Sequence, residues 1–286
     1  MEPTLLQILF LGLVQGAAEL LPVSSSAHVI VTEKLIGLDP SSPSMTFLLV
    51  MLHTGTMIAV IAYFWKAWCS TFFVNAASIK TTAMNVGVAT VATLLVFGVL
   101  KVLIEKIFMR STSHNEIEDL FGHLPLVGGA LLAVGILILI TGLIRKTDGT
   151  HSLDLASSFW IGISQGICLP FRGLSRSGTT ISTGVLLGIT RQRVEEFSFA
   201  LAVVITPPAI AKELIRLLKS HTEAASPAHL IHLLGPGLFG MVGSFIAGIL
   251  ALKLLSSILE KGHWAWFGYY CIAFSGFVFF LAHIGY

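Results

Sequence analysis

The chain has 286 residues, of which 55% are hydrophobic and only 11% are charged. A soluble domain carries about 25% charged residues, so this composition excludes an ordinary soluble protein and indicates an integral membrane protein. The net charge of +2, spread without a basic cluster, excludes nucleic acid as a partner and leaves membrane lipids as the expected surroundings. The apolar runs are too long for barrel strands, so we expect an all-α fold in one polytopic domain, residues 1–286.

Two stretches combine apolar flanks with a polar break. Residues 5–37 contain ELLPVSSSAH, and residues 155–190 contain LPFRGLSRSGTT. Non-helical backbone at membrane depth is tolerated only inside protein or beside a watery cavity. We therefore interpret each stretch as a helix, a turn and a second helix that returns to the same side, because the segment 158–169 is too short to cross a bilayer. Eight or more ordinary spans are the alternative.

Six further runs are long enough to span the membrane, since a bilayer requires roughly twenty residues. They are residues 44–65, 86–104, 125–144, 197–217, 233–255 and 264–284. The pair Pro207-Pro208 falls inside the fourth run and is expected to kink or break that helix.

The two interrupted stretches match one another at a constant offset of 150 residues, since the motif GxxQG at residues 12–16 recurs at residues 162–166. We therefore predict two repeats, residues 1–150 and 151–286, each a re-entrant helix pair plus three transmembrane helices. Because three is an odd number, the repeats would lie inverted in the membrane. The two polar turns would then meet near its midplane.

The first polar turn carries groups that can bind and transfer a phosphoryl group. Gln15 and Glu19 are four residues apart and share a helix face, and Glu19 can hold a divalent cation or act as a base. The serines at 24–26 are expected to cap the next helix, whose free N–H groups form an anion site. His28, three residues after Ser25, can shuttle a proton or attack phosphorus. The serines and the histidine also fit purely structural roles, whereas a carboxylate inside a bilayer is a functional residue by default.

The second polar turn supplies the opposite charge. Arg172 and Arg176 lie among glycines and hydroxyls in FRGLSRSGTT, and a guanidinium offers a planar fork of donors that matches phosphate. Arg172 also fits a role in which its head reaches the membrane interface. A carboxylate, a histidine and hydroxyls opposite arginines suit phosphoryl transfer, and the lipid setting implies a substrate with a polyisoprenoid or acyl tail.

The stretch QGAAELLPVSSSAH resembles the E/Q-G-x-x-E-x-x-P-V-S-S-x-x-H signature of bacterial undecaprenyl-diphosphate phosphatases, and GLSRSGTT resembles their P-G-x-S-R-S-G-x-T motif. The spacing is similar over the whole chain. The resemblance implies removal of the terminal phosphate of undecaprenyl diphosphate with Mg²⁺ or Ca²⁺, in the bacterial plasma (inner) membrane. This activity would recycle the lipid carrier for cell-wall synthesis and confer bacitracin resistance.

The resemblance also assigns roles to particular residues. The catalytic residues would be Glu19, Ser25, His28 and Arg176. Phosphate would be bound by Ser24, Ser175, Ser177 and Thr180, and to these we add Ser26 and Arg172 from the chemistry of the two turns rather than from the family motif. The divalent cation would be held by Glu19 and Gln15. Gln15 leaves Glu19 as the only carboxylate of its pair, and LPFRGLSRS stands where PGFSRS is usual, which adds Arg172 as a further phosphate donor. Whether Ser25, His28 or water attacks phosphorus stays open.

Two rival functions fit parts of the pattern. A transporter or flippase of a polyprenyl phosphate lipid is the main alternative, because inverted repeats with broken helices are typical of transporters. The acid-phosphatase-like lipid phosphatases share only a Ser-x-x-His, and their further histidine–aspartate segment does not follow Ser175-Arg176.

The distribution of basic residues bears on orientation. One side of the six-span topology carries Lys66, Lys80, Arg145, Lys146, Arg191, Arg193 and Lys261. Positive residues favour the cytoplasmic side, so both termini are expected to be periplasmic. A homo-oligomer is left open.

Overall fold

The structure is a computed structural model that describes residues 3–38, 43–108, 123–144, 151–219 and 227–285. Within these ranges every regular element is a helix, with ten α-helices and one short π-helical segment. Six of the described helices are long and apolar enough to span a membrane. The predicted all-α, multi-pass membrane protein is thereby confirmed. Arg145 and Lys146, which the orientation argument uses, lie outside the described residues.

The first half of the chain has two short helices followed by three long ones. The short helices are α1 (Leu5–Leu20) and α2 (Ser25–Leu35), of 16 and 11 residues. The long ones are α3 (Pro43–Thr71), α4 (Ala76–Leu103), which continues into η1 (Ile104–Phe108), and α5 (Leu124–Leu143). At 1.5 Å per residue α1 is about 24 Å long, which is less than the roughly 30 Å hydrocarbon core of a bilayer.

The second half repeats this order. Its short helices are α6 (Leu155–Cys168) and α7 (Arg176–Leu186), of 14 and 11 residues. Its long helices are α8 (Arg191–Lys219), α9 (Pro227–Glu260) and α10 (Ala265–His283). Both interrupted stretches therefore form a helix, a turn and a second helix, as predicted. Because none of the four short helices is long enough to cross a bilayer, they do not support the alternative of eight ordinary spans.

Some helix boundaries differ from those predicted. Helix α8 runs through Pro207 and Pro208, so the prolines do not break it. In a membrane helix the carbonyl that proline leaves without a partner can be satisfied by neighbouring groups. Helix α4 begins at Ala76, ten positions before the predicted start at residue 86, because Asn75 caps it by accepting a hydrogen bond from the backbone N–H of Ser78.

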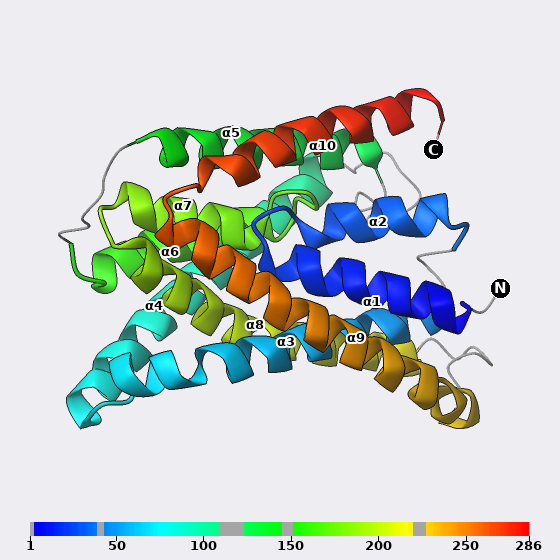
Figure 1. The fold of residues 1–286 in the computed structure, drawn as a ribbon, viewed down its shortest axis with the longest axis horizontal. Coiled ribbons are helices and arrows are strands. Elements are labelled where there is room, and N and C mark those ends of the chain that lie inside the picture. The colour runs from blue at the N-terminus through cyan, green and yellow to red at the C-terminus, as the bar shows by residue number, and fades with distance from the viewer. Residues whose placement is uncertain (1–2, 39–42, 109–122, 145–150, 220–226, 286) are drawn as a thin grey trace. The chain divides into compact units, whose positions relative to one another are not determined.

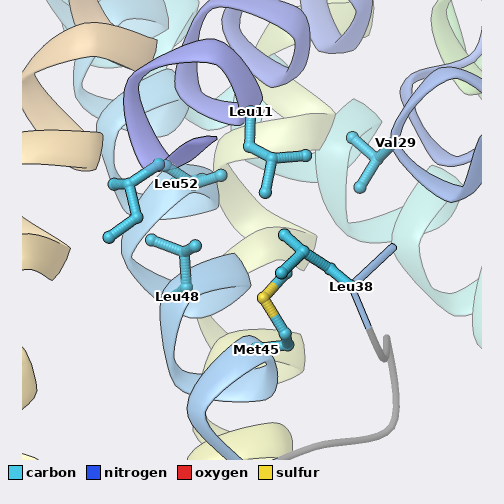
Figure 2. Close-up of a cluster of buried hydrophobic side chains, with 7 residues drawn as sticks. Leu11, Val29, Leu38, Met45, Leu48 and Leu52 are labelled. Atoms are coloured by element: carbon cyan, nitrogen blue, oxygen red, sulfur yellow. The ribbon is translucent and has the colours of Figure 1, made fainter. Parts of the chain in front are cut away.

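The described residues form two compact units, and each unit draws on both halves of the chain. The first unit comprises Met1–Leu21, His28–Trp65 and Ala202–Leu255. Side chains from α1, α2 and α3 and from the segment that follows α2 point toward one another in its core (Figure 2). The cluster consists of Ile8, Leu11, Val29, Leu38, Met45, Leu48 and Leu52. Packing these apolar side chains together buries the face of α1 that carries Ile8 and Leu11.

Small residues let α1 approach α9 closely in the first unit. A Cβ atom on Gly12 would lie 2.8 Å from the carbonyl oxygen of Gly240, and one on Gly16 would overlap with the carbonyl oxygen of Ser244. The Ser244 hydroxyl donates to the carbonyl oxygen of Leu52 at 2.9 Å, which ties α9 to α3 as well. Close packing of this kind is typical of helices that associate in a membrane.

The second unit comprises Pro22–Ala27, Lys66–Leu201 and Ser256–Tyr286. In this unit α5 and α10 lie side by side, and α4 lies against α6 (Figure 1). The contact between α4 and α6 also uses small residues, since a Cβ atom on Gly166 would lie 2.7 Å from the carbonyl oxygen of Thr93. The fully buried Gln165 donates to the Thr93 hydroxyl at 3.1 Å. These contacts hold α6, and with it the start of the second polar turn.

Candidate functional site

The first polar turn joins α1 to α2 through a strained backbone. Ser24 has a φ of +68°, and among the described residues no other non-glycine residue has a positive φ. Such conformations persist only where the surroundings hold them, and they gather at functional sites. The carbonyl oxygen of Pro22 accepts a hydrogen bond from Sγ of Cys271 in α10 at 3.5 Å, and the Oγ atoms of Ser24 and Ser26 are 3.2 Å apart. The turn is thus held by both its own serines and α10.

Helix α2 begins at Ser25, which changes the predicted capping role of the serines. Only Ser24 precedes the helix, whereas Ser25, Ser26 and His28 all lie in its first turn. Ser25 and His28 are three residues apart in a helix and therefore lie on the same face, as predicted. The three serines, Ser24, Ser25 and Ser26, belong to the second compact unit, whereas His28 belongs to the first compact unit.

The second polar turn leads into the N-terminus of α7. Ser175 caps this helix, because its Oγ accepts a hydrogen bond from the backbone N–H of Gly178 at 3.2 Å. Its Oγ also lies 3.4 Å from that of Ser177. Arg176 and Ser177 therefore occupy the first turn of the helix, where free N–H groups and the helix dipole favour a bound anion. Arg172 lies half-buried in the turn that precedes them.

Thr180 stabilises the backbone at the end of the second polar turn. The residue is fully buried, and its hydroxyl donates to the carbonyl oxygen of Arg176 at 2.8 Å. Oγ1 of Thr180 also lies 2.6 Å from Oγ of Ser198 in α8. These two contacts connect the backbone of Arg176 to the first turns of α8.

The two polar turns meet inside the second unit. The backbone N–H of Gly173 donates a hydrogen bond of 3.3 Å to Oγ of Ser26, although 147 residues separate them. Gly173 has a φ of +104°, and a Cβ atom there would overlap with the carbonyl oxygen of Val127 in α5. Only glycine fits this position without strain. The predicted approach of the serine motif and the arginine motif is therefore confirmed by a direct contact.

The acidic motif lies in the first unit. Gln15 is buried, and its Nε2 donates to Oε2 of Glu19 at 3.3 Å, which confirms that the two side chains share a face of α1. The Glu19 side chain keeps 18% of its surface exposed, and its Oε2 lies 3.9 Å from Nε2 of His53 in α3. Over the described part of the chain, no three His, Cys, Asp or Glu side chains are grouped so that they alone could hold a metal ion.

His53 was missed by the sequence analysis, although a signal for it existed. A histidine in the middle of the apolar run 44–65 is costly in a bilayer and by default indicates a function. Ser198 and Cys271 were also missed, because single small polar residues in apolar helices carry no distinctive pattern. Their contacts with Thr180 and Pro22 depend on the tertiary structure.

Comparison with known proteins places the chain in a family. The family model described as bacitracin resistance protein BacA matches residues 8–277. The chain belongs to this family. An undecaprenyl-diphosphatase 2 from Acinetobacter baylyi is 54% identical over 97% of this chain and 98% of its own length. Undecaprenyl-diphosphatases from Korarchaeum cryptofilum and Desulfitobacterium hafniense are 32% and 29% identical, over 93% and 92% of this chain and 95% and 91% of their own lengths.

The match to the BacA family covers both polar turns. Every residue to which the sequence analysis gave a role, from Gln15 to Thr180, falls within the matched range 8–277. The family resemblance inferred from the two motifs is therefore confirmed over nearly the full length of the chain.

Proposed function

We propose that this protein is an undecaprenyl-diphosphate phosphatase of the bacterial plasma membrane. It removes the terminal phosphate of undecaprenyl diphosphate, returns the lipid carrier to cell-wall synthesis as undecaprenyl phosphate, and lowers sensitivity to bacitracin. The hydrogen bond between Gly173 and Ser26 carries this proposal, because it joins the serine motif to the arginine motif in a member of the BacA family.

The reaction breaks the bond between the terminal phosphorus and the bridging oxygen. An oxygen atom from water ends on the terminal phosphorus, and the bridging oxygen leaves with undecaprenyl phosphate. Negative charge on the transferred group and on the leaving oxygen is stabilised by Arg176 and by the N–H groups of α7. The attacking atom belongs to Ser25, to His28 or to a water molecule, and in the first two cases water then hydrolyses a phosphorylated enzyme.

The remaining residues of the two turns hold the diphosphate. Ser24, Ser26, Arg172, Ser175 and Ser177 supply hydroxyl and guanidinium donors. Thr180 was predicted as a further phosphate ligand, but its bonds to Arg176 and Ser198 favour a supporting role.

A divalent cation, Mg²⁺ or Ca²⁺ in the family expectation, would be held by Glu19 with help from Gln15. The donor set fits, because the Glu19 carboxylate is partly exposed and Gln15, whose Nε2 binds that carboxylate, still offers its amide oxygen. A divalent cation held by these two residues would supply positive charge that neutralises phosphate oxygens. Glu19 carries the only charge of the pair.

We further propose that the chain forms two inverted repeats with periplasmic termini. Two observations support the repeats. The order of two short and three long helices is the same in residues 1–150 and 151–286, and the glycines of both GxxQG motifs pack against a neighbouring helix. A reporter enzyme that is active only in the periplasm, fused to the C-terminus, tests the orientation, and an inactive but stably expressed fusion would contradict it.

The activity is tested with the purified protein in detergent. Phosphate release from undecaprenyl diphosphate is measured with and without EDTA, and Arg176→Ala serves as the negative control. We expect release that depends on the cation and is lost in the variant. If the protein released no phosphate but moved a polyprenyl phosphate across vesicle membranes, the alternative of a flippase would replace this proposal.

A further inference from the structure

We propose that Ser198 is a positioning residue of the phosphatase reaction, which fixes the place of Arg176 through Thr180. The inference deepens the proposed function and rests on it, because that function makes Arg176 the side chain that stabilises charge on the transferred phosphate. All three residues belong to the second unit, with Arg176 and Thr180 in α7 and Ser198 in α8.

The direction of the hydrogen bonds is the first argument. Thr180 donates its only hydroxyl hydrogen to the carbonyl oxygen of Arg176 at 2.8 Å. The contact of 2.6 Å between Oγ1 of Thr180 and Oγ of Ser198 therefore needs Ser198 as its donor. Both hydroxyl side chains are fully buried, so bulk water cannot replace either partner. The two bonds form one chain that ends on the backbone of Arg176, and bonds in such chains strengthen one another.

The place of Arg176 in its helix is the second argument. Arg176 is the first residue of α7, and helix ends fray because their first N–H groups have no partner within the helix. The cap at Ser175 holds the N–H of Gly178, whereas Thr180 holds the carbonyl oxygen of Arg176 itself. A guanidinium on a long side chain acts on phosphate with precision only if the backbone that carries it is fixed.

The anchoring of α8 is the third argument. Just before Ser198, the buried carboxylate of Glu195 accepts a hydrogen bond of 2.8 Å from Oγ of Ser256 in α9. The carbonyl oxygen of Glu196 accepts a hydrogen bond of 3.1 Å from Nε1 of Trp68 in α3. The start of α8 is thus tied to two neighbouring helices. Ser198 transmits this fixed position to the first turn of α7.

A second contact between hydroxyl groups on α7 provides a matched control. Oγ of Ser182 lies 3.1 Å from Oγ1 of Thr141 in α5, and both residues are fully buried. This contact also joins α7 to a neighbouring helix, but it lies in a later turn than Arg176. Ser182→Ala therefore removes a contact of the same kind and leaves the chain of bonds to Arg176 in place.

Phosphate release from undecaprenyl diphosphate by the full-length protein in detergent gives kcat and KM, and thermal unfolding in the same detergent gives stability. In Ser198→Ala we expect kcat to fall about 10-fold or more while KM changes less than about threefold, because a displaced Arg176 loses mainly transition-state interactions. Ser182→Ala should lose similar stability and keep the wild-type kcat. If Ser198→Ala fails to fold, Ser198→Cys takes its place, because a thiol of similar shape is only a weak donor and kcat should still fall.

A double-mutant cycle tests whether the effect passes through Thr180. Thr180→Val with Ser198→Ala should lower kcat no further than Thr180→Val alone, whereas independent effects would multiply. Thr180→Ser keeps the hydroxyl and should keep most of the rate. Wild-type kcat in Ser198→Ala, equal losses of kcat in Ser198→Ala and Ser182→Ala, or multiplied losses in the double variant would overturn the inference. A wild-type protein that releases no phosphate would instead overturn the proposed function itself.

Discussion

Replacing Gly173 by alanine tests whether catalysis needs the two turns to meet. The φ of +104° is unfavourable for alanine, and residues held in such regions cost about 1–3 kcal/mol. The new Cβ atom would also overlap with the carbonyl oxygen of Val127, so the turn must move away from α5. Moving it weakens the hydrogen bond to Ser26, which contributes about 0.5–1.5 kcal/mol. The sum is a loss of about 1.5–4.5 kcal/mol of folding free energy.

The effect on catalysis should exceed the effect on stability. A displacement of about 1 Å in a positioned site can lower a rate roughly 10²-fold, so we expect kcat for phosphate release to fall by that order. Gly129→Ala is the control, because Gly129 lies in α5 near Val127 and a Cβ atom there meets nothing within 4 Å. Initial rates and thermal unfolding are measured for both variants in one detergent. Wild-type kcat and stability in Gly173→Ala would refute the reasoning.

Three further predictions concern charge. Arg176→Lys keeps the charge but loses the planar fork, so kcat should fall roughly 10²-fold or more, whereas Arg172→Ala should cost less; the opposite ranking in phosphate release would contradict the assignment. Glu19→Gln should lose most activity even at saturating Mg²⁺, and full wild-type activity in excess EDTA would exclude the cation. Hydrogen bonds from Ser157 to Asp154, at the start of α6, hold the pKa of that carboxyl below its ordinary value. The charged carboxylate therefore stabilises the protein above about pH 4, and this contribution is lost as the pH falls through the lowered pKa. Between about pH 7 and pH 3 the midpoint temperature of unfolding should drop more for the wild type than for Asp154→Asn. Equal drops in the two proteins would contradict this prediction.

The long helices were predictable because length and hydropathy alone decide which segments cross a bilayer. The approach of the two turns was predictable as well, because it followed from the repeated GxxQG motif and the cost of polar groups in lipid. The start of α4 was not predictable, since residues 76–85, a mixture of polar and apolar side chains, stay helical once Asn75 caps the helix. A hydropathy pattern shows where the apolar part of a helix lies, but not where the helix begins or ends.

The details of the site depended on contacts that a sequence does not show. A positive φ is expected of glycine, so nothing in the amino-acid sequence indicates that Ser24 adopts a positive φ. His53 follows Glu19 by more than thirty residues in a different helix, and only the packing of α1 near α3 places its ring opposite the carboxylate. The same holds for Ser198 behind Thr180.

The glycine contact between α1 and α9 has a consequence for the order in which the protein is made. Gly16 packs against Ser244, so α1 needs a partner that is made 228 residues later in the chain. At about 5–20 residues per second, roughly 10 to 50 s pass between the synthesis of these two residues. During that interval α1, with Gln15 and Glu19, has to be sheltered by the insertion machinery or stay at the membrane surface. Nascent chains arrested before α9 should therefore leave α1 open to protease, and the N-terminal half made alone should fail to fold its first unit until the other half is supplied.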